Sequence, residues 1–132
     1  MSSLMRFLVV DDSITNRILI KEMLRGKAEC IEAEDGLAAW KLYTKSLEVK
    51  RYDLLLLDIA MPQMDGIKLL TLIRENENSK DEIHLPVLII SAQTEKIEDA
   101  KNAGCDDFLL KPITSQQLYQ KVLKLTHNDL FR

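Results

Sequence analysis

The stretch LLLLDIAMPQMDG, residues 54–66, runs four consecutive leucines directly into an aspartate, Asp58. The leucines do not alternate with polar residues, which is typical of a strand covered on both faces, as in a parallel sheet. A carboxylate at the end of such a strand is ionised at a cost, paired with a cation, or used in chemistry. The stretch therefore predicts a buried parallel strand and raises the question of what Asp58 does.

Four other short segments are predicted to be strands of the same sheet. Three are continuous apolar runs and one alternates apolar with polar residues: RFLVV (6–10), PVLII (86–90), DFLLK (107–111) and the alternating AECIEAE (28–34). Alternation is typical of a half-exposed strand, so the last segment is expected at an edge of the sheet.

Amphipathic segments separate the predicted strands. They favour helices over about 14–26, 36–48, 66–76, 95–103 and 115–127. Strands that alternate with helices through short connections are parallel and joined by right-handed crossovers. The sequence therefore predicts one α/β domain over residues 1–132, a doubly wound (βα)5 fold with its core at about 5–127.

Particular residues mark the predicted helix ends. Asp35 and Asp65 are candidate N-caps, because their carboxylates can accept hydrogen bonds from free backbone N–H groups. Thr114 begins a pattern typical of a capping box, and Gly104 is a natural residue just past a helix. The polar stretch NENSKDEIH (76–84) is interpreted as a surface loop.

Composition excludes several classes of function. The 132 residues carry a formal charge of −3 without a basic stripe, which argues against direct nucleic acid binding. No apolar run approaches the roughly 20 residues that cross a membrane, and the start lacks a signal peptide, so a cytoplasmic location is expected. Cys30 and Cys105 are predicted to be buried free thiols rather than a disulfide. We expect a monomer or a weak dimer.

Polar residues follow four of the predicted strands. The first strand ends in Asp11 and Asp12, the third in Asp58, the fourth in Ser91 and the fifth in Lys111. Open α/β sheets bind ligands at the carboxyl ends of their strands, where the strand order reverses. In the strand order 2-1-3-4-5, the first and third strands meet at that point. The three aspartates are then expected in one crevice.

Three clustered carboxylates repel one another, so either one takes a proton or a cation sits among them. Hard oxygen ligands with room for water suit Mg²⁺ better than Zn²⁺. Lys111 adds a mobile positive charge and Ser91 a hydroxyl donor. These groups together suit a phosphoryl group whose phosphorus is attacked by Asp58.

Each residue alone has a simpler interpretation. Asp11 and Asp12 could cap the following helix, Ser91 could bond to the backbone, and Lys111 could be a solvated lysine or a salt-bridge partner for Asp58. The simpler interpretations do not explain why all of these residues stand at strand ends. Their joint placement favours a functional site.

The chain resembles the receiver domains of bacterial two-component response regulators, in particular the single-domain chemotaxis regulators. The motifs that carry the resemblance cover about 5–127: VVDDS (9–13), LLLLDIAMPQMDG (54–66), ISA (90–92) and GCDDFLLKP (104–112). The resemblance implies a flavodoxin-like five-stranded sheet and phosphorelay signalling. The implied phosphodonor is a histidine kinase or a histidine phosphotransfer protein, and the output protein is unknown.

The resemblance also implies roles for individual residues. Asp58 matches the phospho-accepting aspartate, and Lys111 matches the phosphate-binding lysine. Asp12, Asp58 and the backbone carbonyl of Ala60 match the ligands of Mg²⁺, whereas Asp11 would act largely through a water molecule.

A second group of residues matches the family's conformational switch. Ser91 matches the switch hydroxyl, where threonine is frequent, and Phe108 the switch aromatic, where tyrosine is frequent. The expected output surface consists of the fourth helix, fifth strand and fifth helix. The peptide bond before Pro112 is expected to be cis.

Two other functions remain open at this point. A phosphatase of the haloacid-dehalogenase type would need an acid/base aspartate where this chain has Ala60, which argues against a turnover enzyme. A flavodoxin-like module would place a flavin phosphate against the repelling Asp11 and Asp12. The segment DDSITNR (11–17) also resembles receivers inside hybrid kinases, so the domain is either free-standing or part of such a protein.

Overall fold

Five parallel strands form the sheet in the computed structural model, and their order in space is β2-β1-β3-β4-β5. The strands are β1 (Met5–Val10), β2 (Ala28–Ala33), β3 (Leu54–Leu57), β4 (Val87–Ser91) and β5 (Asp107–Leu110). The predicted order is confirmed, and the alternating segment is the edge strand β2. The structure describes residues 4–61 and 63–132. The first three residues of the chain, which are part of the start interpreted as lacking a signal peptide, lie outside the described residues.

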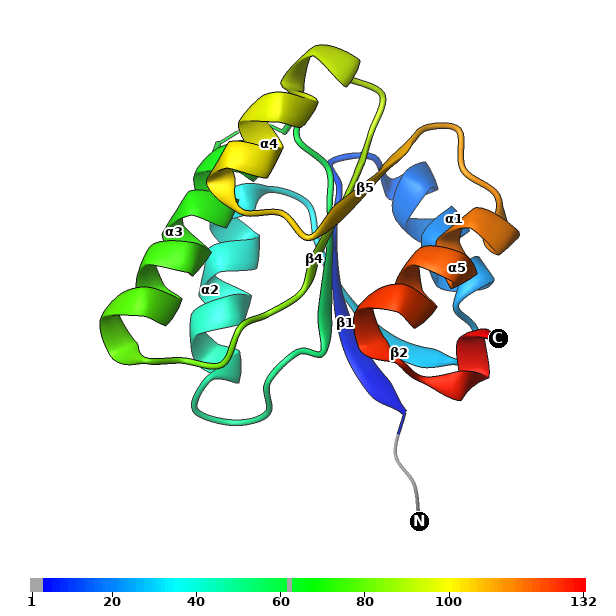
Figure 1. The fold of residues 1–132 in the computed structure, drawn as a ribbon, viewed down its shortest axis with the longest axis horizontal. Coiled ribbons are helices and arrows are strands. Elements are labelled where there is room, and N and C mark those ends of the chain that lie inside the picture. Colours follow the sequence, from blue (N-terminus) through cyan, green and yellow to red (C-terminus); the bar gives the residue numbers. More distant parts are fainter. Residues whose placement is uncertain (1–3, 62) are drawn as a thin grey trace.

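Helices cover both faces of the sheet. They are α1 (Ile14–Met23), α2 (Gly36–Ser46), α3 (Gly66–Lys80), α4 (Ile97–Ala103, after a 3-10 turn at Thr94–Lys96) and α5 (Ser115–Thr126). Figure 1 shows α2, α3 and α4 on one side of the sheet and α1 and α5 on the other. None of the helices within the described ranges is long and apolar enough to cross a membrane.

Strand β3 shows why its sequence is uniformly apolar. Leu55 and Leu57 belong to the core under α2 and α3, whereas Leu54 and Leu56 belong to the core under α1 and α5. All four side chains are buried. Because helices cover both faces, neither face of the strand leaves a position for a polar side chain.

The predicted helix ends at Asp35, Asp65 and Thr114 are confirmed. Each side chain accepts a hydrogen bond from the backbone N–H three residues later, and Thr114 completes a capping box. Gly104 follows α4 with a φ of 104°, a conformation that favours glycine.

The prediction of a surface loop at 76–84 is wrong for its first part, because α3 continues to Lys80. The reason is a tertiary contact of Glu77. Its carboxylate is buried, accepts two hydrogen bonds from Arg74 one turn earlier, and accepts another from the backbone N–H of Leu85. These bonds favour helix in a segment whose composition is typical of a loop.

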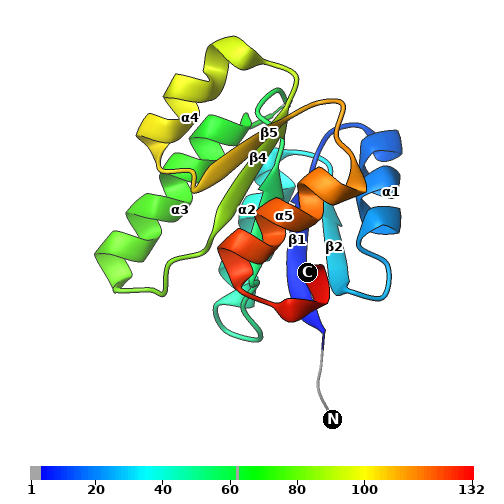
Figure 2. The same cartoon turned by 45° about the vertical axis from the view of Figure 1, so that its right-hand side comes forward.

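Two further segments, the end of α1 and the turn after α5, differ from the prediction or add to it. Helix α1 ends at Met23, and the chain turns away through Gly26, whose φ is 77°. After α5 a 3-10 turn at Asp129–Phe131 lies beside α5 and β1 (Figure 2). It buries Phe131, whose ring stacks on Phe7 of β1.

Cys30 and Cys105 are free thiols, as predicted, although both are half-buried rather than fully buried. Burial raises the pKa of Cys30 to about 11. A thiol with so high a pKa is mostly protonated near neutral pH and is a weak nucleophile.

Candidate functional site

Asp11, Asp12 and Asp58 meet at the carboxyl edge of the sheet. Val10 of β1 pairs with Leu57 of β3, so the residues that follow the two strands stand level. One carboxylate oxygen from each aspartate lies within 4.8 Å of the other two. Asp11 and Asp58 are 2% and 7% exposed, and Asp12 is exposed to solvent. We call this cluster the acidic pocket, and its geometry is the one expected from the strand ends.

Lys111 brings the nearest positive charge to the acidic pocket. Its Nζ lies 2.8 Å from Asp11 Oδ2 and 3.4 Å from Asp58 Oδ2. The following bond, to Pro112, is cis, as the resemblance implies. Lys111 therefore contacts two of the three carboxylates, and the cluster keeps an excess of negative charge.

Asp58 is poorly compensated in its ionised form. Burial raises the pKa of Asp58, the neighbouring Asp11 raises it too, and Lys111 together with the backbone N–H of Ala60 offsets only part of the effect. A cation bound among the three oxygens would remove this penalty. The donor set, three carboxylates with one exposed member, fits the hard-oxygen coordination and retained water of Mg²⁺.

Ser91 ends β4 and is fully buried. Its Oγ accepts a hydrogen bond of 3.1 Å from the backbone N–H of Gln93, and its carbonyl accepts one from the backbone N–H of Lys111. Within the described part of the chain, no hydrogen bond joins Ser91 to Asp58. In this state the hydroxyl therefore serves the turn that follows β4.

Phe108 lies on the edge strand β5, opposite Ile89 of β4. Its half-buried ring packs against the core on the α4 side. The Nζ atoms of Lys101 and Lys121 lie 5.4 and 6.0 Å from the ring centroid. Phe108 thus lies on strand β5 of the expected output surface. Its partner on β4, Ile89, comes two residues before Ser91, so Phe108 and Ser91 are not level in the sheet.

Some residues that shape the pocket were not singled out from the sequence. Ser13, rather than Asp11 or Asp12, is the N-cap of α1, and its backbone N–H donates to Asp11 Oδ1. Arg17 donates to the Asp11 carbonyl. Gly66 lets α3 begin against the Asp58 backbone, because a Cβ there would lie 2.3 Å from the Asp58 carbonyl oxygen. All three lie within motifs quoted from the sequence, VVDDS, DDSITNR and LLLLDIAMPQMDG, but the motifs alone do not show these contacts.

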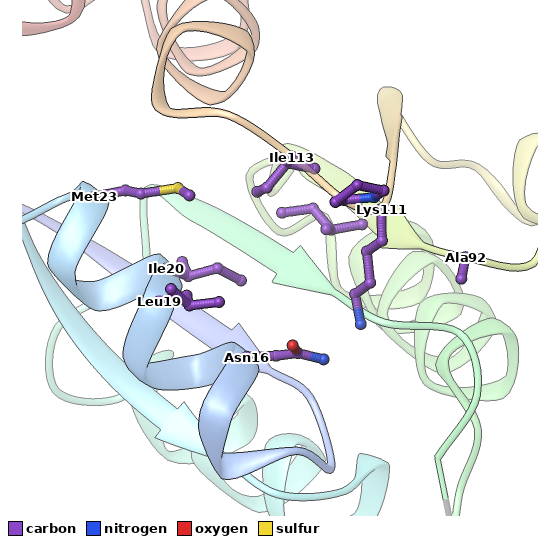
Figure 3. A pocket seen from close by; sticks show the side chains of 9 residues that line it. Asn16, Leu19, Ile20, Met23, Ala92, Lys111 and Ile113 are labelled. Atoms are coloured by element: carbon purple, nitrogen blue, oxygen red, sulfur yellow. The ribbon is translucent and has the colours of Figure 1, made fainter.

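An apolar groove of about 400 Å³ opens beside the acidic pocket, between α1 and the loop after β5. Figure 3 shows Leu19, Ile20 and Met23 of α1 facing Ile113 across it, with Lys111 at its rim. The groove continues the surface of α1, of which Leu19 is 52% exposed. It could hold apolar side chains within reach of the pocket.

Comparison with known proteins gives the family. Residues 7–123 match the sequence profile of the response regulator receiver domain. The chain belongs to this family. It is 38% identical over 125 residues to the chemotaxis protein CheY of Pseudomonas aeruginosa, covering 92% of this chain and 95% of CheY. Signalling through phosphorylation is the general function of receiver domains.

Two solved structures of similar proteins hold Mg²⁺, one of them in its active-site cleft. The receiver domain of a sensor histidine kinase from Pseudomonas aeruginosa PAO1, with magnesium in its active-site cleft, superposes with a TM-score of 0.80 at 27% identity, over 96% of this chain and 100% of that one. The CheY of a CheX–CheY complex with BeF₃ and Mg²⁺ from Borrelia burgdorferi gives 0.79 at 28% identity, over 91% and 87%. Receiver domains therefore bind Mg²⁺ at the acidic pocket, and they interact with kinases and output partners.

Proposed function

We propose that this protein is a phosphorylation switch in which Asp58 accepts a phosphoryl group from a histidine kinase or a histidine phosphotransfer protein. The observation that supports the proposal best is the placement of the buried Asp58 carboxylate beside Asp11 and within 3.4 Å of Lys111 Nζ. The protein acts as a signalling domain and not as an enzyme that turns over an external substrate.

In the proposed reaction, a carboxylate oxygen of Asp58 forms a bond to phosphorus. The P–N bond to the donor histidine breaks, and its electron pair leaves with the imidazole nitrogen. Lys111 holds a phosphoryl oxygen with its ammonium group, which requires Nζ to exchange part of its contact with Asp11. The burial of Asp58 restricts water, which would otherwise compete for the phosphoryl group.

Mg²⁺ would be held by Asp12, Asp58 and the carbonyl of Ala60, with Asp11 acting through a water molecule. When bound, it supplies positive charge that offsets the repulsion between the carboxylates and the anionic phosphoryl donor. Asp12 is suited to this role because its exposed carboxylate is accessible from solvent, whereas Asp11 already binds Lys111 and the Ser13 backbone.

The apolar groove supports a helical phosphodonor. Leu19 lines the groove and is 52% exposed, and Ile14 and Ile18, 63% and 53% exposed, add further apolar surface elsewhere on α1. A donor helix that packs its apolar face there would bring a histidine on the same helix toward Asp58. This arrangement fits a protein phosphodonor better than a small molecule alone.

We further propose that phosphorylation changes the surface of α4, β5 and α5. A phosphoryl group on Asp58 would attract the Ser91 hydroxyl away from the Gln93 N–H. Movement of the β4–α4 turn then opens space toward which the Phe108 ring turns, and the positions of Lys101 and Lys121 beside that ring change with it. An output protein would read this surface.

The test is labelling by radioactive acetyl phosphate. We expect a base-labile adduct that requires Mg²⁺ and is abolished in Asp58→Asn, while Asp129→Asn, which changes an exposed aspartate on the C-terminal turn, labels like the wild type. Labelling that persists in excess EDTA or in Asp58→Asn would contradict the proposal. Continuous release of p-nitrophenol from p-nitrophenyl phosphate would favour the phosphatase instead.

A further inference from the structure

Arg17 connects the acidic pocket to the edge of the sheet. Its side chain projects from α1, is only 11% exposed, and makes two hydrogen bonds in different directions. Nη1 donates to the carbonyl oxygen of Asp11 at 2.6 Å, and Nε donates to Glu32 Oε1 at 2.9 Å. The guanidinium group therefore joins the loop after β1 to strand β2.

Glu32 is a firm anchor for this side chain. Its second carboxylate oxygen accepts a hydrogen bond from Lys21 at 2.9 Å. The hydrogen bonds from Lys21 and Arg17 lower the pKa of Glu32 against the opposing effect of burial. Glu32 thus stays ionised near neutral pH and holds the guanidinium in place. Lys21 shares Glu32 with Arg17, but among the described residues no hydrogen bond or ion pair joins Lys21 to Asp11.

The carbonyl that Arg17 binds belongs to the peptide between Asp11 and Asp12. Asp11 is otherwise held by its backbone N–H on Ala33 and by its carboxylate on Ser13 and Lys111. These contacts fix Asp11 itself. The orientation of the next residue depends on the plane of this peptide, because rotating it would carry the Asp12 carboxylate away from Asp58.

We infer that Arg17 is a positioning residue for the cation site: it holds the Asp11–Asp12 peptide so that Asp12 faces Asp58. The inference rests on the proposed function, since it concerns the same acidic pocket. It also gives the arginine of DDSITNR (11–17) a role that neither phosphorylation nor the ligand set requires. Arg17 itself does not contact the cation.

The direction in which Mg²⁺ affinity changes when Arg17 is removed distinguishes a positioning role from a purely electrostatic one. Arg17 is a cation near a cation site, so on charge alone its removal would strengthen Mg²⁺ binding. On the positioning account its removal weakens binding, because Asp12 loses its fixed orientation. Residues that orient metal ligands without touching the metal typically change affinity by about 10-fold or more.

The experiment is calorimetric titration of Mg²⁺ into the wild type, Arg17→Met and Lys21→Met. We expect Kd to rise about tenfold in Arg17→Met and to stay within about twofold in Lys21→Met, which removes a positive charge from the same Glu32 but no contact with Asp11. Arg17→Lys keeps the charge and should show most of the loss, because a single ammonium cannot span both partners. Urea unfolding of each variant reports stability separately.

Unchanged or tighter Mg²⁺ binding by Arg17→Met overturns the inference. Equal losses in Arg17→Met and Lys21→Met also overturn it, because the effect would then come from Glu32. If Arg17→Met does not fold, Arg17→Lys tests the same link at constant charge: Kd should rise several-fold, and an unchanged Kd overturns the inference. Absence of Mg²⁺ binding in the wild type would instead refute the proposed function.

Discussion

Two clusters of charged residues lie at opposite ends of the sheet, and they differ in how completely their charges are paired within the protein. At the amino ends of β4 and β5, the Arg74 cluster consists of Arg74 and Glu77 of α3, His84 and Asp106. Arg74 donates to both carboxylate oxygens of Glu77 at 2.8 and 2.9 Å and to Asp106 at 2.9 Å. His84 Nε2 lies 2.8 Å from the other oxygen of Asp106.

Backbone groups complete the Arg74 cluster. Arg74 also donates to the carbonyls of Leu85 and Gly104, while the backbone N–H of Leu85 donates to Glu77 and that of Val87 to Asp106. Each charged group here is therefore surrounded by matched partners. The acidic pocket is the opposite, because one lysine contacts only two of its three carboxylates.

The difference shows how to tell a structural charge cluster from a functional one in this fold. Burying a charge is costly unless its hydrogen-bonding partners are complete. The Arg74 cluster has that complement within the protein, whereas the acidic pocket leaves charge to be balanced by a ligand. The uncompensated charge at the carboxyl edge of the sheet is thus what a bound cation would balance.

The largest expected effect separates the clusters by stability. Arg74→Met should lower the free energy of unfolding by about 3 kcal/mol, because the buried Glu77 and the carbonyls of Leu85 and Gly104 lose their donor. Mg²⁺ affinity should not change. Urea unfolding and calorimetry measure both, with the exposed Arg25→Met as the control. A loss below 1 kcal/mol would mean that the cluster is not structural.

A second substitution tests whether the stability of the acidic pocket depends on the positive charge of a bound cation. Lys111→Met should lower the free energy of unfolding by about 2 kcal/mol in EDTA, because the buried Asp11 loses its ion-pair partner. Saturating Mg²⁺ should restore much of this loss by binding only the folded protein. In Arg74→Met the same addition should give no larger stabilisation than in the wild type. Equal responses of the two variants would erase the distinction between the clusters.

The smallest expected effect has the opposite sign. Burial raises the pKa of Asp58, so the folded chain holds this proton more tightly than the unfolded chain. That stabilisation is complete below the ordinary aspartate pKa and is lost as the pH rises through the raised pKa. In EDTA at pH 7, Asp58→Asn should therefore be more stable than the wild type by about 1 kcal/mol. The gap should close as the pH falls toward about 4.

Unfolding midpoints across this pH range provide the measurement. Asp129→Asn is the matched control, since its carboxylate is 80% exposed and paired only with Arg132 in the described structure. An Asp58→Asn variant less stable than the wild type at pH 7 would show that Lys111 outweighs burial. The acidic pocket would then be a satisfied ion pair, like the Arg74 cluster.

The sequence was sufficient to predict the acidic pocket because the argument needed only strand ends. Apolar runs locate the parallel strands, and parallel strands bring Asp11, Asp58 and Lys111 to one edge whatever the details of packing. Ser91 was also placed correctly, but the acceptor role of its hydroxyl toward Gln93 depends on the conformation of one turn. Periodicity carries no information about that turn.

The Arg74 cluster could not be predicted in the same way. Its partners come from α3, from the loop before β4 and from the loop before β5, and no local pattern marks them. Glu77 stood in a polar stretch typical of a loop, yet it is 6% exposed. Arg17 is similar, because its bond to Asp11 depends on the crossing of α1 over the sheet. Long side chains that satisfy distant backbone groups are visible only in three dimensions.

Gly66 has a consequence for how mutational screens of this protein are interpreted. A Cβ at this position would lie 2.3 Å from the carbonyl oxygen of Asp58 and 2.9 Å from Cα of Ile59, distances that only a shift of the loop could relieve. In a saturation library scored by signalling output, position 66 should tolerate substitution as poorly as position 58. A glycine without a reactive group would then be grouped with the phospho-acceptor, so intolerance at this edge measures steric room as well as chemistry.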